Sequence, residues 1–239
     1  MRNKVDKKTV LLVFAQKEEY EPFFKNLQHT TITLSNGLEL TKSKINNYTI
    51  YAFYSGVGKV AIAYKLGLFL SIITPDLIIN IGVAGSISNN LKAFDILVAT
   101  KSCYYDADLT ECGYKLGNMS GMPLYFNCDE YFINNILKYA TSEDNIKTGL
   151  ILTGDSFITK KLVDKQWFKC FDNPLACDME SASVGQVAFM ANVPYLVVRA
   201  ISDEVIASKS NQDDYNNQLN EASEKAALLV RKVFETKNA

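Results

Sequence analysis

Short apolar runs alternate with longer stretches of helical length along most of the chain. Apolar residues at consecutive positions are typical of strands that are covered on both faces. Six runs follow this pattern: residues 10–15, 49–54, 77–81, 96–100, 147–152 and 195–201. The stretches with helical length are residues 58–73, 131–140, 181–192 and 216–235. This alternation predicts an α/β sandwich around a mixed or parallel sheet.

The helix expected at residues 58–73 differs from the others, because apolar side chains lie nearly all round it. A helix without a polar face is covered on more than one side. Its second cover is either another subunit or the interior of the same domain. Neither repeats nor a linker rich in Pro, Gly or Ser divide the sequence. We therefore expect a single domain over residues 1–239, with residues 1–8 as a loose N-terminal extension.

Charge and composition exclude several classes of function. The 239 residues include 25 basic and 26 acidic side chains, so the net charge is -1. Without a strong positive field, binding to nucleic acid has no electrostatic support. His29 is the only histidine, which disfavours catalytic triads and most zinc or iron sites. We expect no metal and no nucleic-acid partner.

Cysteines and apolar segments bear on the compartment. The five cysteines are odd in number and show no C-x-x-C spacing, which favours a reducing environment. The apolar run at residues 10–15 is too short for a signal peptide and is followed by charged residues. No run reaches the roughly 18 apolar residues of a membrane span. These features predict a cytoplasmic protein without a membrane partner.

Two glycine segments follow strands. Residues 56–61 match G-x-G-x-x-A and open a helix, as a dinucleotide site requires. The next strand ends in Asn80-Ile81-Gly82, without the carboxylate that would hold a ribose. A tight strand-to-helix turn is therefore the better interpretation. We expect a second glycine turn at residues 81–86, where a ligand could approach the backbone closely.

Acidic residues follow two of the expected strands and one short apolar segment. Glu18 and Glu19 follow the first, Asp178 and Glu180 follow a short apolar segment, and Asp203 follows the last. Each one alone is explained equally well by helix capping or by the helix dipole. Arg199 lies inside the last apolar run, where an arginine must find a carboxylate partner or reach a cleft. The spacing is compatible with one shared site.

Read in order from about residue 9 to 234, the sequence resembles the 5'-methylthioadenosine/S-adenosylhomocysteine nucleosidases of the nucleoside phosphorylase superfamily. The Met-Glu and Arg-Ala-Ile-Ser-Asp segments are specific in combination. The segments that carry the resemblance are residues 15–19, 55–59, 80–85, 106–110, 113–114, 153–158, 179–180 and 198–203.

The resemblance implies a three-layer α/β/α domain around a mixed, largely parallel sheet, and a homodimer that needs no cofactor. Such an enzyme hydrolyses the N-glycosidic bond of adenine nucleosides with a 5'-thio substituent, releasing adenine and the substituted ribose. Carried over by position, Asp203 is the general acid that protonates adenine N7. Glu19 activates the attacking water, and Arg199 helps to order the water and the carboxylates.

The same resemblance implies the residues that hold the substrate. Glu180 holds the ribose hydroxyls, with Met179 against the sugar. Phe157 stacks on the adenine while the Ile158 backbone pairs with its edge. The remaining expected substrate-binding residues are Gly85 and Ser202 near the base and, around the 5'-thio group, Val57 and Tyr215 with Leu109 and Tyr114 of the neighbouring subunit.

The scarcity of arginine favours hydrolysis over phosphorolysis. Arg199 is the only arginine between Arg2 and Arg231, and a phosphate cage is hard to build from so few. A phosphate-dependent purine or uridine phosphorylase stays as an alternative, as does a non-catalytic nucleoside-binding module. An NAD-dependent oxidoreductase is a more distant alternative.

Three positions depart from what the family usually carries. Val83 stands in place of a serine, Gln16 in place of a methionine beside the ribose, and Cys112 in place of an aromatic residue in the dimer-contributed pocket. The acid and the base are intact. The preferred 5' substituent is therefore open, and adenosylhomocysteine, 5'-deoxyadenosine and aminodeoxyfutalosine are all candidates.

Overall fold

The computed structural model describes residues 8–141, 144–163, 167–208 and 210–236. Its strands form one ten-stranded mixed sheet. The strands are β1 (Lys8–Phe14), β2 (His29–Thr33), β3 (Glu39–Ile45), β4 (Tyr48–Tyr54), β5 (Leu77–Ser86), β6 (Ile96–Tyr104), β7 (Phe126–Asn127), β8 (Ile146–Thr153), β9 (Pro174–Asp178) and β10 (Tyr195–Glu204).

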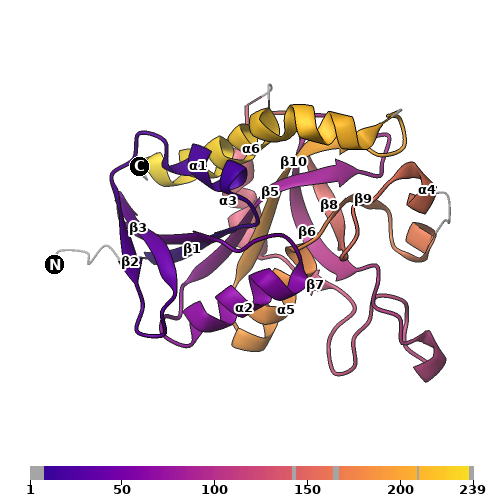
Figure 1. The fold of residues 1–239 in the computed structure, drawn as a ribbon, viewed down its shortest axis with the longest axis horizontal. Coiled ribbons are helices and arrows are strands. Elements are labelled where there is room, and N and C mark those ends of the chain that lie inside the picture. The colour runs from indigo at the N-terminus through magenta and orange to yellow at the C-terminus, as the bar shows by residue number, and fades with distance from the viewer. Residues whose placement is uncertain (1–7, 142–143, 164–166, 209, 237–239) are drawn as a thin grey trace.

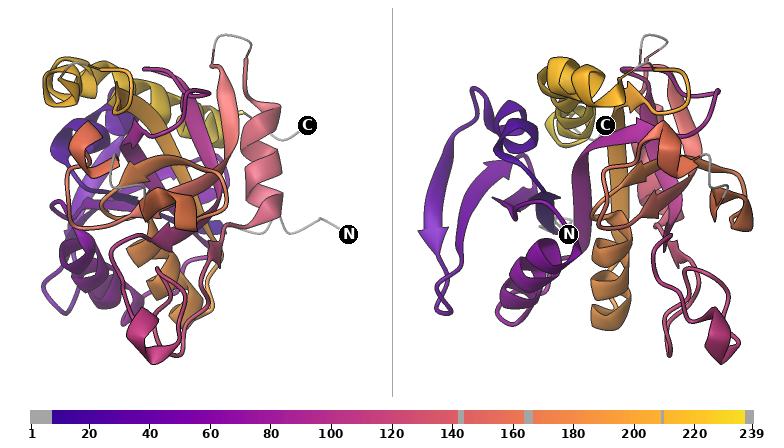
Figure 2. Two further views of the ribbon diagram at one scale, coloured as in Figure 1. Left: turned by 90° about the vertical axis from the view of Figure 1, so that its right-hand side faces the viewer. Right: turned by 45° about the vertical axis from the view of Figure 1, so that its right-hand side comes forward.

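Helices cover both faces of this sheet, as Figures 1 and 2 show. The α-helices are α1 (Lys17–Phe24), α2 (Lys59–Leu70), α3 (Glu130–Lys138), α4 (Lys160–Val163), α5 (Ser181–Ala191) and α6 (Asn211–Glu235), and two short 3₁₀ helices are η1 (Thr110–Cys112) and η2 (Trp167–Cys170). On one face α6 packs against β5 and β10 with α1 and α3 beside it. On the other face lie α2 and α5. The expected three-layer arrangement is confirmed.

Part of the sheet closes on itself. β5 pairs in parallel with both β1 and β10, and β1 pairs in parallel with β4. From β10 the pairing continues through β6, β8 and β9, and β9 returns to the end of β5 in antiparallel orientation. These five strands therefore form a closed ring, which the sequence did not predict.

All six expected strands and all four expected helices are present, with shifted ends. The expectation missed β2, β3, β7 and β9. Polar residues interrupt every apolar run in β2 and β3, and the side chains of β2 are largely exposed. β7 has only two residues, and β9 was expected only as a short apolar segment. Of the expected N-terminal extension, residues 1–7 lie outside the described residues, and Lys8 already belongs to β1. Within the described ranges, no helix is long and apolar enough to cross a membrane.

The glycine turn expected at residues 81–86 is wrong, because β5 continues through it to Ser86. The glycines serve close packing instead. A Cβ on Gly82 would overlap the carboxylate of Glu19, and a Cβ on Gly85 would lie 3.0 Å from Asp203 Oδ2. The absence of these side chains therefore makes room for two carboxyl groups next to the strand.

Candidate active site

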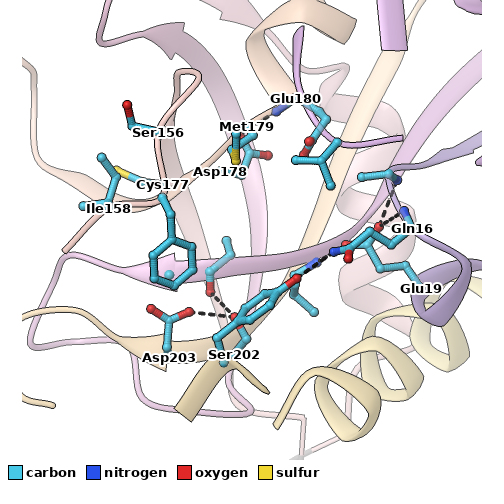
Figure 3. Close-up of a pocket in the computed structure, with 17 residues that line it drawn as sticks. Gln16, Glu19, Ser156, Ile158, Cys177, Asp178, Met179, Glu180, Ser202 and Asp203 are labelled. Carbon is cyan, nitrogen blue, oxygen red and sulfur yellow. Dashed lines mark hydrogen bonds between the residues drawn. The ribbon is translucent and has the colours of Figure 1, made fainter. Parts of the chain in front are cut away.

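A pocket opens at the carboxyl ends of β1, β5, β9 and β10. In α/β folds this is the edge of the sheet where ligands bind. Figure 3 shows its walls. The lining residues are Ala15, Gln16, Glu19, Val57, Val83, Ala84, Gly85, Ser156, Phe157, Ile158, Cys177, Asp178, Met179, Glu180, Ser202, Asp203 and Tyr215. All the expected site residues are among them except Arg199, Leu109 and Tyr114.

Glu19 is held at one side of the pocket by backbone donors. Its Oε2 accepts hydrogen bonds from the amides of Ala15 and Gln16 at 2.9 and 3.0 Å, and its Oε1 accepts one from Val83 at 3.0 Å. The turn from β1 into α1 places the first two donors, and β5 places the third. Burial raises the pKa of Glu19, although the charge of Arg199 and the three amides oppose this. A buried carboxylate with a raised pKa is a suitable base near neutral pH.

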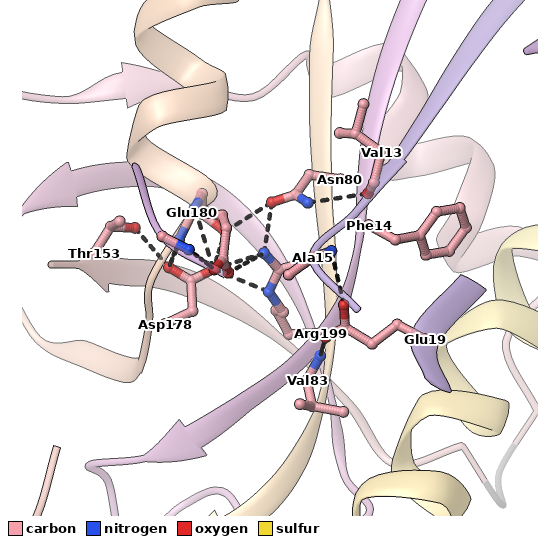
Figure 4. A network of polar contacts seen from close by, with 12 residues as sticks. Val13, Phe14, Ala15, Glu19, Asn80, Val83, Thr153, Asp178, Glu180 and Arg199 are labelled. Atoms are coloured by element: carbon pink, nitrogen blue, oxygen red, sulfur yellow. Dashed lines mark hydrogen bonds and ion pairs between the residues drawn. The ribbon is translucent and has the colours of Figure 1, made fainter. Parts of the chain in front are cut away.

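A buried ion pair supports the floor of the pocket (Figure 4). Arg199 on β10 is 1% exposed, and its Nη2 and Nε lie 2.7 and 2.9 Å from Asp178 Oδ2. Its Nη2 also donates to Asn80 Oδ1. Asp178 accepts further hydrogen bonds from the Thr153 hydroxyl and the Ser181 amide. A buried ion pair of this kind is fixed in one geometry, because each charge would be costly to bury alone.

Glu180 lies next to this pair at the start of α5. Its Oε1 accepts a hydrogen bond from the Gly58 amide at 2.8 Å, and its Oε2 lies 3.9 Å from Arg199 Nη2. Burial and the neighbouring Asp178 charge raise the pKa of Glu180 to about 8. The Gly58 donor comes from the turn before α2, where a φ of 102° requires glycine. The first glycine segment therefore positions a carboxyl group.

The third nitrogen of the Arg199 guanidinium, Nη1, is buried without a hydrogen-bond partner. A buried charged donor in this state is a site for a polar ligand or an ordered water. Arg199 does not line the pocket itself. It does lie close enough to Glu19 and Glu180 to affect the pKa of both.

Asp203 occupies the side of the pocket opposite Glu19 (Figure 3). A β-bulge in β10 interrupts the register between Ile201 and Asp203, so that Asp203 pairs with Gly85. Asp203 Oδ1 accepts a hydrogen bond from the Ser202 hydroxyl at 2.8 Å, and Oδ2 accepts one from Asn211 Nδ2 at 2.9 Å. Burial raises the pKa of Asp203.

Aromatic and amide side chains form the remaining wall. The Phe157 and Tyr215 rings meet edge to face, with centroids 5.6 Å apart. Gln16 Nε2 donates to the Tyr215 hydroxyl at 2.7 Å, which links the start of α1 to the first turns of α6. Val83 and Gln16, two of the departures from the family pattern, therefore lie in the pocket itself.

Leu109 and Tyr114 do not reach this pocket. They lie in the segment between β6 and β7 that carries η1 and projects away from the sheet (Figures 1 and 2). Tyr114 is 37% exposed, and its hydroxyl lies 3.1 Å from the Ser120 hydroxyl. Cys112, the third departure, is exposed in the same segment.

Sequence reasoning gave no role to Asp178, Asn80 or Asn211. A buried arginine needs a carboxylate partner, so the sequence did predict an acidic partner for Arg199. Asp178 is that partner. Nothing in the sequence singled out Asn211, since an asparagine near a helix start reads as an ordinary cap. In the described part of the chain, no group of His, Cys, Asp and Glu is arranged to hold a metal ion.

Comparison with known proteins shows where this fold and pocket occur. The model of the phosphorylase superfamily matches residues 9–235. The 5'-methylthioadenosine/S-adenosylhomocysteine nucleosidase of Haemophilus ducreyi is 34% identical over 220 residues, covering 92% of this chain and 94% of that protein.

Two solved structures agree with this result. The Streptococcus pyogenes S-adenosylhomocysteine nucleosidase, in complex with 5-methylthiotubericidin, has a TM-score of 0.90 and 29% identity, covering 99% of this chain and all of that one. The Streptococcus pneumoniae 5'-methylthioadenosine/S-adenosylhomocysteine nucleosidase, with the transition-state inhibitor MT-ImmA, has a TM-score of 0.87 and 29% identity over 95% and 98%. The chain therefore belongs to the phosphorylase superfamily and, within it, to the 5'-methylthioadenosine/S-adenosylhomocysteine nucleosidases.

Proposed function

We propose that this enzyme hydrolyses the N-glycosidic bond of 5'-methylthioadenosine and S-adenosylhomocysteine, releasing adenine and the 5-thio-substituted ribose. One observation carries the assignment of roles: Asp203 lies on one side of the pocket, and Glu19 and Glu180 lie across it (Figure 3). An acid on one side of the scissile bond and a base with a water on the other is the arrangement that inverting glycosidic hydrolysis requires.

Asp203 is the general acid in this proposal. Adenine leaves poorly as an anion and well when N7 is protonated, so a proton donor is needed beside the base. Burial favours the protonated form of Asp203. Phe157 stacks on the adenine and the Ile158 backbone pairs with its edge. Gly85 leaves space for the carboxyl group, and the Ser202 hydroxyl donates a hydrogen bond to it.

Glu19 activates the water that attacks the anomeric carbon. As adenine leaves, positive charge develops on the sugar, and a carboxylate on the opposite face stabilises it. Arg199 does not line the pocket, so it acts through its charge, which favours the anionic form of Glu19 that accepts a proton from the water. Val83 stands where many relatives carry a serine, so this site relies on Glu19 and Arg199 without a hydroxyl at that position.

Glu180 holds the ribose hydroxyls, with Met179 against the sugar. A carboxyl group that grips two hydroxyls is left unpaired by a deoxy-sugar, which the site should therefore reject strongly. Val57 and Tyr215 lie near the 5' substituent. Gln16 and Tyr215 form a polar pair beside the sugar. Competition between the methylthio, homocysteine and 5'-deoxy compounds measures which 5' substituent this pair favours.

The nucleophile is water because a phosphate cage is lacking. Arg199 is engaged by Asp178 and Asn80. Arg231 contacts Glu235 and the carbonyl of Lys25, remote from the pocket residues. Phosphate bound by guanidinium groups usually takes two parallel hydrogen bonds from each. Among the described residues, no arginine lines the pocket.

We also propose that the enzyme is a homodimer. Large apolar side chains are exposed on the outer layer: Val60 (79%) and Tyr64 (65%) on α2, and Phe189 (56%) and Met190 (67%) on α5. Exposed large apolar side chains on two neighbouring helices are typical of an interface. The projecting segment then delivers Leu109 and Tyr114 to the pocket of the other subunit. A sedimentation run that gave only monomer would contradict this arrangement.

The five free thiols support a reducing compartment, so we place the enzyme in the cytoplasm. Cell fractionation with an antibody to the chain tests this placement.

The decisive experiment incubates the purified enzyme with 5'-methylthioadenosine or S-adenosylhomocysteine, with and without phosphate, and identifies both products. Free adenine with the free thio-sugar, indifferent to phosphate, supports the hydrolase. A sugar 1-phosphate formed only with phosphate would show a phosphorylase instead. Tight nucleoside binding without adenine release would indicate a binding module.

A further inference from the structure

Asn211, the first residue of α6, lies behind the wall of the pocket and is only 7% exposed. Its Nδ2 donates to Asp203 Oδ2 at 2.9 Å and to the carbonyl of Ile158 at 2.8 Å. The two hydrogens of one amide group are thereby used on two partners from different parts of the chain. Asp203 comes from β10, and Ile158 comes from the loop between β8 and α4.

Helix capping does not explain this residue. Ser210 precedes α6 and caps it by accepting a hydrogen bond from the Asp213 amide. The Asn211 side chain turns inward instead, toward the carboxyl group. One turn later on the same helix, Tyr215 accepts the hydrogen bond from Gln16, which neighbours Glu19. The first turns of α6 therefore contact both sides of the pocket.

The direction of the Asn211 hydrogen bond has a chemical consequence. An amide that donates to a carboxyl oxygen binds the anion more strongly than the neutral acid. It therefore stabilises the charge that appears on Asp203 when its proton leaves. The donor also fixes the rotamer of the carboxyl group, since the Ser202 hydroxyl holds the other oxygen at 2.8 Å.

We propose that Asn211 is a positioning residue for the reaction: it orients the Asp203 carboxyl group, stabilises its conjugate base, and fixes the distance between that carboxyl group and the Ile158 backbone. This proposal rests on the proposed function, in which Asp203 protonates the base and the Ile158 backbone pairs with its edge. The same amide then sets the spacing between the two groups that read the leaving purine.

The ionisable groups around Asp203 do not favour its anionic form. The ionisable groups that face it are the buried thiol of Cys177 on β9 and the carboxylate of Asp214 on α6, whose charge raises the pKa of Asp203. Across the pocket stand Glu19, Glu180 and the Tyr215 hydroxyl. We find no cation in hydrogen-bond contact with Asp203 among the described residues, so neutral donors alone oppose the effect of its burial.

The test is the pH dependence of turnover in Asn211→Leu, which keeps a similar volume but cannot donate. The enzyme needs Asp203 protonated, so activity falls as the pH rises through its pKa. Removing a donor that favours the anion raises this pKa. We therefore expect the alkaline limb of the kcat profile to move upward by about one pH unit, and the maximal kcat to fall by about 10- to 100-fold.

Asn211→Ser provides a second variant, because serine is too short to span both acceptors and introduces no apolar bulk. Asn217→Leu, an exposed position on the same helix, is the matched control and should retain the wild-type profile. Thermal unfolding of each variant checks that the fold is kept. An unshifted alkaline limb in both Asn211 variants would overturn the proposal.

The proposed function and the positioning role of Asn211 can be refuted separately. If the wild-type enzyme releases no adenine from either nucleoside, the proposed function is wrong. If the wild type is active and the Asn211 variants change only their stability or KM, the function stands and the positioning role is wrong.

Discussion

Buried carboxyl groups stand on both sides of the pocket, but their partners differ. On the side that the proposal gives to the sugar (the sugar side), Glu19 and Glu180 accept hydrogen bonds from backbone amides. Both lie near the guanidinium of Arg199, which is itself fixed by Asp178. On the base side, Asp203 receives only a hydroxyl and a side-chain amide. Burial raises the pKa on both sides.

The difference concerns what holds each charge. A nearby cation and rigid backbone donors keep carboxylates in place and permit one of them to act as a base. Neutral donors from side chains orient Asp203 while burial keeps its protonated form accessible. In the proposed function, the carboxyl groups of Glu19 and Asp203 take opposite roles because their surroundings differ. Substitutions on either side of the pocket test this contrast.

Asp203→Asn breaks the base side directly. The amide has nearly the same shape but cannot supply the proton, so we expect kcat to fall by about 10³-fold or more. Binding of the nucleoside should change by only a few fold. Steady-state kinetics and calorimetric binding of 5'-methylthioadenosine measure the two effects, and a variant with near wild-type turnover would refute the acid assignment.

Arg199→Met removes the cation on the sugar side. Asp178 is then left buried with only neutral donors, and loss of one partner from such a pair costs about 3 kcal/mol or more. We expect the free energy of unfolding in urea to fall by that amount. Arg231→Met, which removes a partly exposed guanidinium, is the control with a smaller expected effect. Equal stability of the two variants would contradict the structural role of Arg199.

Glu180→Gln tests the charge on the sugar side through pH. Because burial raises the pKa of Glu180 to about 8, the folded state favours its protonated form. The stability gained from this preference is fully present below the pKa that Glu180 has in the unfolded chain, and it is lost as the pH rises through about 8. Glutamine is neutral throughout, so the variant should lose less stability between pH 5.5 and 8.5.

We expect the Tm of Glu180→Gln to lie about 5 °C above that of the wild type at pH 8.5, and the difference to be smaller at pH 5.5. Differential scanning calorimetry without ligand measures both. Parallel pH dependence of the two proteins would show that Glu180 does not titrate in this range.

Tyr215→Phe tests the contact between the two sides. The Gln16 amide loses its acceptor, and a single hydrogen bond of this kind contributes about 1 kcal/mol. We expect kcat/KM for 5'-methylthioadenosine to fall about fivefold. Tyr131→Phe, an exposed tyrosine on α3, is the control. Unchanged kinetics in Tyr215→Phe would show that the link between α1 and α6 has no catalytic consequence.

The sequence predicted the strands with unbroken apolar runs well and the other strands poorly. β1, β5 and β10 are covered on both faces, so their apolar runs were unmistakable. β2 and β3 are held by pairing at the edge of the sheet, and backbone hydrogen bonds leave no apolar signature. The closed ring through β9 depends on pairings between distant segments, which local patterns do not specify.

For the candidate site, the sequence by itself determined which acidic residues follow strands, and that the arginine in the last strand needs a partner. The resemblance to a family supplied the roles. Only the tertiary structure decided that Asp178 pairs with Arg199, that Gly82 and Gly85 make room for carboxyl groups, and that Asn211 reaches Asp203. The reason is physical: burial and hydrogen-bond direction, which set the pKa and orientation of each group, arise from segments that are far apart in the chain and meet only when it folds.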